Sequence, residues 1–171
     1  ALAWEQQHLN ACVADIFGYH AMQLGLPEID ALRENRMPLR VCASDRIDDE
    51  CGAGEPHCVV SVLNRFDELP FATQSIDLVV MPHILEFAAE PHQVLREVDR
   101  VLVPEGHVVI TGFNPLSLWG VRQWLTRLGM QPYLPREGQF IGLPRVKDWL
   151  KLLSFEVNRG RFGCYLPWVR S

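Results

Sequence analysis

The sequence predicts an α/β fold: a Rossmann-like, doubly wound and mostly parallel sheet with an antiparallel hairpin at its C-terminal edge. Short apolar runs alternate with helical patterns between residues 9 and 112, which is typical of βαβ units. These runs are mostly apolar and do not alternate with polar residues, as expected for strands in a sheet that is covered on both faces. A length of 171 residues fits one domain, so we expect residues 1–171 to form a single unit.

The N-terminal part of the chain is predicted to contain one helix and three strands. Mostly apolar positions fall on one helical face, namely 9, 13, 16, 17 and 20. Short apolar runs predict strands at residues 21–24, 39–43 and 58–63. Gly25 and Pro27 are expected to break the chain after the first of these strands.

The same alternation continues in the middle of the chain. Residues 76–81 form the next predicted strand. Pro91 is tolerated at a helix start, and apolar residues at helical spacing extend the predicted helix to Leu102. A turn at residues 104–106 then leads into a predicted strand at residues 107–112.

The C-terminal part is predicted to contain an insertion between two helices. Helical spacing indicates helices at residues 118–128 and 146–153. Proline and glycine are frequent between them, so we expect residues 115–145 to include a loop or flap. Residues 155–157 and 161–165 are predicted to pair as the terminal hairpin.

Composition and charge exclude several classes of protein. Sixteen basic and 21 acidic residues give a net charge of −5 without a basic stripe, so a dedicated nucleic-acid-binding protein is not expected. The apolar runs are far shorter than the ~20 residues of a membrane-spanning helix. The five cysteines form no Cys-x-x-Cys pair, and no signal peptide is visible. We therefore expect a cytoplasmic protein with free thiols, no metal and no membrane contact.

Motifs between residues 69 and 106 indicate a family. Leu69-Pro70-Phe71 is followed by Ser75-Ile76-Asp77-Leu78-Val79-Val80, by His83-Ile84-Leu85-Glu86-Phe87 and by residues 90–106. In this order they resemble class I S-adenosylmethionine-dependent methyltransferases with a type 11-like methyltransferase domain. Residues 116–120 and 160–165 resemble an atypical bacterial branch of that superfamily. The resemblance implies S-adenosylmethionine as cofactor and methyl transfer to a small-molecule acceptor.

In such a sheet the ligand lies outside the carboxyl ends of the strands. The resemblance implies cofactor-binding roles for Gln23, Gly25, Ser44, Asp45, Asn64, Arg65, Met81 and His83. The sequence also departs from the family here. Gln23 stands where the family has an acidic residue, and residues 26–28 replace the glycines of its loop. Arg65 stands at the acceptor position for the adenine amino group, although a guanidinium accepts no hydrogen bond.

Candidate reactive residues follow the fourth and fifth predicted strands. His83 is the candidate general base, because an imidazole titrates near neutral pH. The competing interpretation is a histidine that starts a helix and bonds to neighbouring backbone. Glu86, three residues further on, is expected to orient a neighbour. The acceptor side is expected near Asn114 and Trp119.

Three alternatives remain open at this level. Because the N-terminal half departs from the family, a catalytically inactive binding or assembly module on the same fold is the first. Another nucleotide-binding enzyme would need a Gly-x-Gly-x-x-Gly loop, which the sequence lacks. Basic residues concentrated in the C-terminal third leave RNA open as an acceptor. The sequence indicates no oligomeric state.

Overall fold

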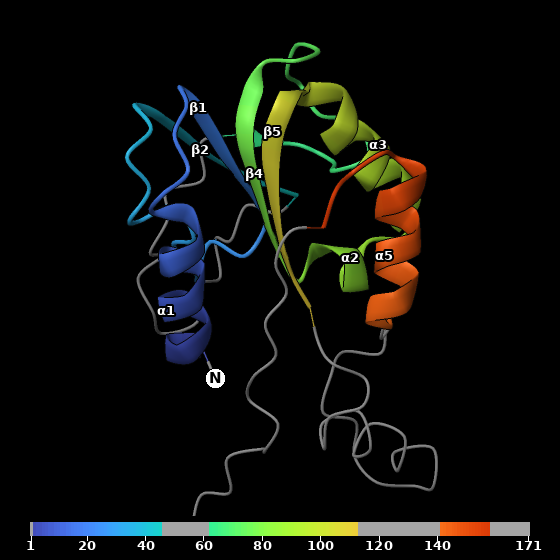
Figure 1. The fold of residues 1–171 in the computed structure, drawn as a ribbon, viewed down its shortest axis with the longest axis horizontal. Coiled ribbons are helices and arrows are strands. Elements are labelled where there is room, and N and C mark those ends of the chain that lie inside the picture. The colour runs from blue at the N-terminus through green and yellow to red at the C-terminus, as the bar shows by residue number, and fades with distance from the viewer. Residues whose placement is uncertain (1, 46–61, 113–140, 158–171) are drawn as a thin grey trace, which may run out of the picture.

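The computed structural model describes residues 2–45, 62–112 and 141–157, whose strands form one five-stranded sheet. In chain order the strands are β1 (His20–Leu24), β2 (Leu39–Ser44), β3 (Val62–Leu63), β4 (Ile76–Pro82) and β5 (Leu102–Thr111). Their order across the sheet is β3-β2-β1-β4-β5, and each pairing is parallel. The order reverses between β1 and β4, as in a doubly wound sheet (Figure 1).

Helices cover both faces of this sheet (Figure 1). They are α1 (Leu2–Val13), α2 (Ile84–Phe87), α3 (Pro91–Val101) and α5 (Leu143–Leu152). Helix α1 packs on one face through Leu9 and Val13, while α3 and α5 pack on the other through residues such as Leu95 and Trp149. The α/β class and the two-sided coverage predicted from the sequence are confirmed.

Strand β4 shows why its sequence is apolar at successive positions. Leu78 and Val80 pack in the cluster that contains α1, whereas Val79 and Met81 pack in the cluster that contains α3 and α5. Successive side chains of a strand point to opposite faces of the sheet. All four side chains are therefore fully buried, and burying each of them contributes about 1.5–3 kcal/mol.

The predicted antiparallel edge is not supported. Residues 155–157 form no strand, because the chain leaves α5 through a turn that includes Ser154 in the left-handed region, with φ +62°. Residues 161–165, the other half of the predicted hairpin, lie outside the described residues. The described sheet is parallel throughout.

The N-terminal helix ends earlier than its apolar pattern predicts. Helix α1 stops at Val13, and the chain then turns into β1. Oδ2 of Asp77 accepts hydrogen bonds from the backbone N–H groups of Tyr19 and His20, each at 2.9 Å, which fixes the entry to the strand. Phe17, which the helical pattern placed on the apolar face, is 75% exposed. A contact distant in sequence therefore overrides the local pattern.

Other boundaries differ by a few residues. Strand β5 begins at Leu102, five residues before the prediction, and includes the turn at Glu105, whose φ is +65°. Helix α5 begins at Leu143, inside the predicted flap, because Pro144 is tolerated in its first turn. The third strand is described only from Val62 onward. The predicted helix at residues 118–128 lies outside the described residues.

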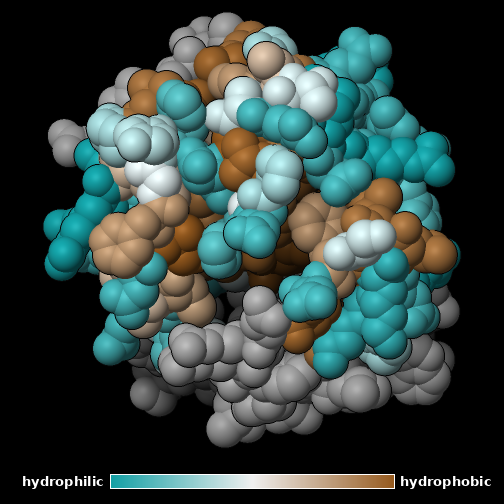
Figure 2. All heavy atoms as spheres, turned by 45° about the horizontal axis from the view of Figure 1, so that its top comes forward, coloured by the Kyte–Doolittle hydropathy of each residue, from teal (hydrophilic) through white to brown (hydrophobic). Residues whose placement is uncertain are grey.

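Hydrophobic residues also reach the surface, in patches between hydrophilic ones (Figure 2). The most exposed large apolar side chains include Phe17, Tyr19 and Leu152. Single exposed apolar residues are normal in globular domains, so they mark no site by themselves.

Candidate active site

The carboxyl ends of the five strands bring most of the predicted site residues to one edge of the sheet. Ligands of doubly wound sheets bind at this edge, where the strand order reverses. The residues at the ends of β1 to β5 are Gly25, Ser44, Asn64, His83 and Thr111. Asn114 and Trp119, predicted on the acceptor side, lie outside the described residues.

Gln23 is fully buried in β1, and its side chain organises the loop that follows. Its Nε2 donates to the carbonyl oxygens of Gly25, Leu26 and Ile29 at 3.1, 3.0 and 2.7 Å. Its Oε1 accepts a hydrogen bond from the backbone N–H of Ala31 at 2.9 Å. A carboxylate has no N–H to offer these carbonyls. Glutamine therefore suits this loop, in place of the acidic residue expected from the family.

Gly25 is required where β1 ends. Its φ is +66°, in the left-handed region that favours glycine, and Leu26 follows with φ +44°. A Cβ atom at Gly25 would lie 2.2 Å from Cδ1 of Ile84, the first residue of α2. Ile84 thus packs directly against the loop backbone.

The connection between β1 and β2 contains turns and no helix. A helix that starts after the first strand would offer free backbone N–H groups and a positive dipole end to an anion. This part of the edge, next to Gly25, lacks that feature. It is the clearest departure of the structure from the βαβ pattern predicted from the sequence.

The ends of β2 and β3 lie side by side. The backbone N–H of Asn64 donates to the carbonyl oxygen of Ser44 at 2.9 Å. Ser44 is buried, and Asp45 beside it is exposed. Oδ1 of Asn64 is buried and has no hydrogen-bond partner among the described residues. Because buried acceptors are normally paired, this oxygen suits an N–H or O–H donor of a ligand.

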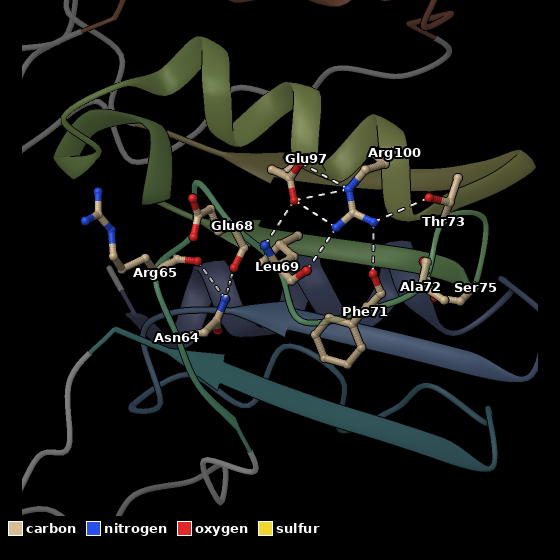
Figure 3. A network of polar contacts seen from close by, with 10 residues as sticks. All are labelled: Asn64, Arg65, Glu68, Leu69, Phe71, Ala72, Thr73, Ser75, Glu97 and Arg100. Atoms are coloured by element: carbon tan, nitrogen blue, oxygen red, sulfur yellow. Dashed lines mark hydrogen bonds and ion pairs between the residues drawn. The ribbon is translucent and has the colours of Figure 1, made fainter.

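The side chain of Arg65, unlike Oδ1 of Asn64, is not buried at this edge. This side chain is 80% exposed, and its Nη2 lies 2.6 Å from Oδ2 of Asp67. The hydrogen bond between them raises the pKa of Arg65 and lowers the pKa of Asp67. Figure 3 shows the guanidinium of Arg65 turned away from the neighbouring polar network. Of these two neighbouring residues, only Asn64 therefore offers a buried hydrogen-bond acceptor.

Met81 differs from the other predicted cofactor residues. Its side chain is fully buried in the core between the sheet and α3. A side chain in that position stabilises the fold and leaves only backbone atoms for a ligand.

His83 lies where β4 and β5 end, between the carboxylates of Glu5 and Glu86. Its Nε2 is 3.0 Å from Oε1 of Glu5 in α1, and its Nδ1 is 3.4 Å from Oε2 of Glu86. Oγ1 of Thr111 donates to Oε1 of Glu5 at 2.7 Å. Gly112 leaves room for Glu86, since a Cβ there would lie 2.7 Å from Oε1 of Glu86. The contact between His83 and Glu86 agrees with the orienting role expected for Glu86.

The two carboxylates keep His83 protonated at neutral pH. Burial alone would lower the pKa of His83, but hydrogen bonds and charges of Glu5 and Glu86 outweigh it and raise the pKa to about 9. Burial would raise the pKa of Glu5, but its hydrogen bond to His83 and the charge of His83 lower it instead. An imidazolium accepts no proton, so His83 can act as a general base only after this ion pair has lost its proton.

Neither Glu5 nor Thr111 was predicted as a site residue from the sequence. Glu5 is 78 residues from His83 and lies in no recognisable motif. Only the three-residue spacing of His83 and Glu86 was visible as a contact on one helical face. Pairing with Glu5 depends on the packing of α1 against the sheet.

The described parts of the chain contain neither a metal-ligand cluster nor a membrane-spanning helix. No group of three or more His, Cys, Asp or Glu side chains is placed to hold a metal ion there. No helix within those parts is long and apolar enough to cross a membrane.

Comparison with known proteins finds a family model that matches part of the chain and a relative. Residues 38–110 match the family described as "Methyltransferase domain". The uncharacterized protein YafS of Escherichia coli K12 is 33% identical over 163 residues, which are 95% of this chain and 63% of that protein. The chain thus spans less than two thirds of the length of this curated relative.

Solved structures share the fold. A SAM-dependent methyltransferase of Thermotoga maritima, described as a possible histamine N-methyltransferase, has a TM-score of 0.69 at 18% identity, covering 92% of this chain and 72% of that one. A methyltransferase of Mesorhizobium loti that depends on S-adenosylmethionine has a TM-score of 0.63 at 16% identity, covering 93% and 83%. Residues 38–110 thus match the methyltransferase-domain model, and the chain shares the fold of these S-adenosylmethionine-dependent methyltransferases.

Proposed function

We propose that this protein transfers a methyl group from S-adenosylmethionine to a small-molecule acceptor in the cytoplasm. The observation that supports it most strongly is the position of the family match. Residues 38–110 include β2 to β4 and most of β5, and therefore the carboxyl ends that present Ser44, Asn64 and His83. When bound, the cofactor supplies an electrophilic methyl group on a sulfonium.

The nucleoside end of the cofactor is assigned to the ends of β2 and β3. Ser44, Asp45 and Asn64 offer oxygen acceptors there, which suit ribose hydroxyls and an adenine amino group. The methionine end is assigned to the loop that Gln23 and Gly25 organise after β1. Since no helix begins in this loop, contacts with its backbone would have to hold that end.

On the acceptor side, His83 serves as a positively charged group and not as a base at neutral pH. In the protonated ring, Nε2–H faces Oε1 of Glu5 and Nδ1–H faces Oε2 of Glu86. Methyl transfer from a sulfonium needs alignment of the acceptor more than proton removal. Asn114 and Trp119, after β5, are assigned to the acceptor. Because a structural neighbour is described as a possible histamine N-methyltransferase, small amines belong in the first acceptor screen.

A second candidate function is a catalytically inactive binding or assembly module. Three features around β1 favour it: Gln23 replaces an acidic residue, Ile84 packs against Gly25, and no helix follows. Each feature reduces the contacts available to the methionine end of the cofactor.

Isothermal titration calorimetry of the full chain decides between these functions. S-adenosylmethionine and S-adenosylhomocysteine are the ligands, and ATP and NAD are the controls. Saturable binding of either methionine derivative, with both controls silent, is expected for a methyltransferase. No heat up to millimolar ligand, on a sample with a cooperative thermal unfolding transition, would reject it in favour of the inactive module. An RNA acceptor is tested separately by adding RNA to the loaded protein.

A further inference from the structure

Helix α3 fixes the loop between β3 and β4 through a carboxylate and a guanidinium (Figure 3). Nη2 and Nη1 of Arg100 donate to the carbonyl oxygens of Leu69 and Phe71, both at 2.9 Å. Oε2 of Glu97 accepts a hydrogen bond from the backbone N–H of Leu69 at 3.0 Å. The two side chains also form an ion pair, in which Nη2 of Arg100 lies 2.8 Å from Oε2 of Glu97. We call Glu97 and Arg100 the α3 clamp.

The α3 clamp fixes both the position and the direction of the backbone groups that it binds. Hydrogen bonds from a charged donor or acceptor are stronger than neutral ones, and the planar fork of arginine fixes direction as well as distance. Here both backbone groups of Leu69 are bound by the clamp. The mutual hydrogen bond lowers the pKa of Glu97 and raises the pKa of Arg100, so both stay charged over the physiological range.

Asn64 lies five residues before the clamped position, in the same loop. Its Nδ2 donates to the carbonyl oxygens of Arg65 and Glu68, at 2.7 and 3.4 Å. Since Glu68 directly precedes Leu69, the clamp fixes one of the two acceptors that orient this carboxamide (Figure 3). With both amide contacts made to the loop, Oδ1 points the other way and is buried without a hydrogen-bond partner in the described residues.

We propose that Glu97 and Arg100 are positioning residues of the nucleoside site: they hold residues 68–71 so that Oδ1 of Asn64 is presented to an N–H or O–H donor of the ligand. This inference rests on the proposed function. It gives α3 a part in cofactor affinity, although Arg100 lies at the end of α3 that leads into the start of β5. It differs from a purely stabilising role of the clamp in one respect, because it requires Arg100 to act on the ligand through Asn64.

Binding of S-adenosylhomocysteine to the full chain, measured by calorimetry, tests this coupling. The variants are Arg100→Met, Asn64→Ala and the double variant, with Arg96→Met as the matched control on an exposed position of α3. Asn64→Ala removes the acceptor and is expected to weaken binding about tenfold. Arg100→Met should weaken binding by a similar factor, and the double variant no further than either single one. Arg96→Met should bind as the wild type does.

Arg100→Lys keeps the charge but not the fork and serves as a second variant if Arg100→Met unfolds. It should show an intermediate loss of affinity and faster hydrogen exchange at the N–H of Leu69. Wild-type affinity in a folded Arg100 variant, or losses that multiply in the double variant, would overturn the inference while leaving the proposed function intact. Failure of the wild type to bind would overturn both together.

Discussion

Nε2 of His83 lies 3.0 Å from Oε1 of Glu5, although the two residues are 78 positions apart in the sequence. The contact joins α1 to the carboxyl end of β4, and Thr111 extends it to the end of β5 through its hydrogen bond to Glu5. Glu5 lies outside the region that matches the family, residues 38–110. The N-terminal helix therefore contributes a charged group to the candidate active site.

The first prediction concerns pH. The pKa of His83 is raised from 6.5 to about 9 in the folded protein, so the folded state binds a proton that the unfolded chain releases above pH 6.5. This stabilisation is fully present below pH 6.5 and is lost as the pH rises through 9. Urea unfolding between pH 6 and 9.5 should show a free energy of unfolding that falls by at most about 1.4 kcal/mol per pH unit.

His83→Gln is the control for that slope. The variant should be less stable near pH 6, and its difference from the wild type should shrink toward pH 9. A difference that stays constant over this range would contradict a protonated His83 in the folded state.

The second prediction separates the two carboxylates. Glu5→Gln removes a negative charge beside His83, so the pKa of His83 should fall from about 9 toward 6.5. An NMR titration of the imidazole measures this pKa directly. Thr111→Val removes the hydroxyl that donates to Glu5 and should produce a smaller fall. Glu28→Gln, an exposed position, is the matched control and should leave the titration unchanged. An unshifted titration in Glu5→Gln would show that Glu86 alone holds the proton.

The sheet was predictable from local patterns, while the site was predictable only in part. The apolar sequence of β4 predicts a buried strand, and in the structure each of its apolar residues packs on one face of the sheet or the other. Helix α3 was visible from Pro91 and from apolar residues at helical spacing, all of which are buried. These features depend on neighbours along the chain, which a single sequence shows.

Long-range contacts set the features that the sequence did not predict. Helix α1 ends at Val13 and not near residue 20, and the hydrogen bonds of Asp77 to Tyr19 and His20 fix the chain as it enters β1. The loop after β1 has turns because the Gln23 side chain binds its carbonyl groups. Neither contact has a periodicity or a motif, so patterns in one sequence do not reveal it.

The third prediction tests the loop that Gln23 organises. Gln23→Ala leaves three carbonyl groups and one N–H without their partner, and is expected to cost about 2–4 kcal/mol of stability. Gln23→Glu restores the acidic residue of the family but places a carboxylate against carbonyl oxygens. It should be at least as destabilising as alanine at pH 7 and should recover at lower pH. Equal stability of Gln23→Glu and the wild type in urea unfolding would mean that these carbonyls do not face the side chain.

The fourth prediction separates two reasons why Gly25 is a glycine. Gly25→Ala adds a Cβ that would lie 2.2 Å from Cδ1 of Ile84, and it also places alanine at φ +66°. Ile84→Val removes Cδ1 and leaves Cγ1, which lies 3.4 Å from the added Cβ. Gly25→Ala should therefore cost more in the wild type than in Ile84→Val, and the residual cost of about 1–2 kcal/mol reports the left-handed backbone. The measurement is a double-mutant cycle in urea, with Ile84→Val alone as the reference. Additive losses would show that Ile84 moves away freely, in which case its packing against Gly25 does not restrict the space for the methionine end of the cofactor.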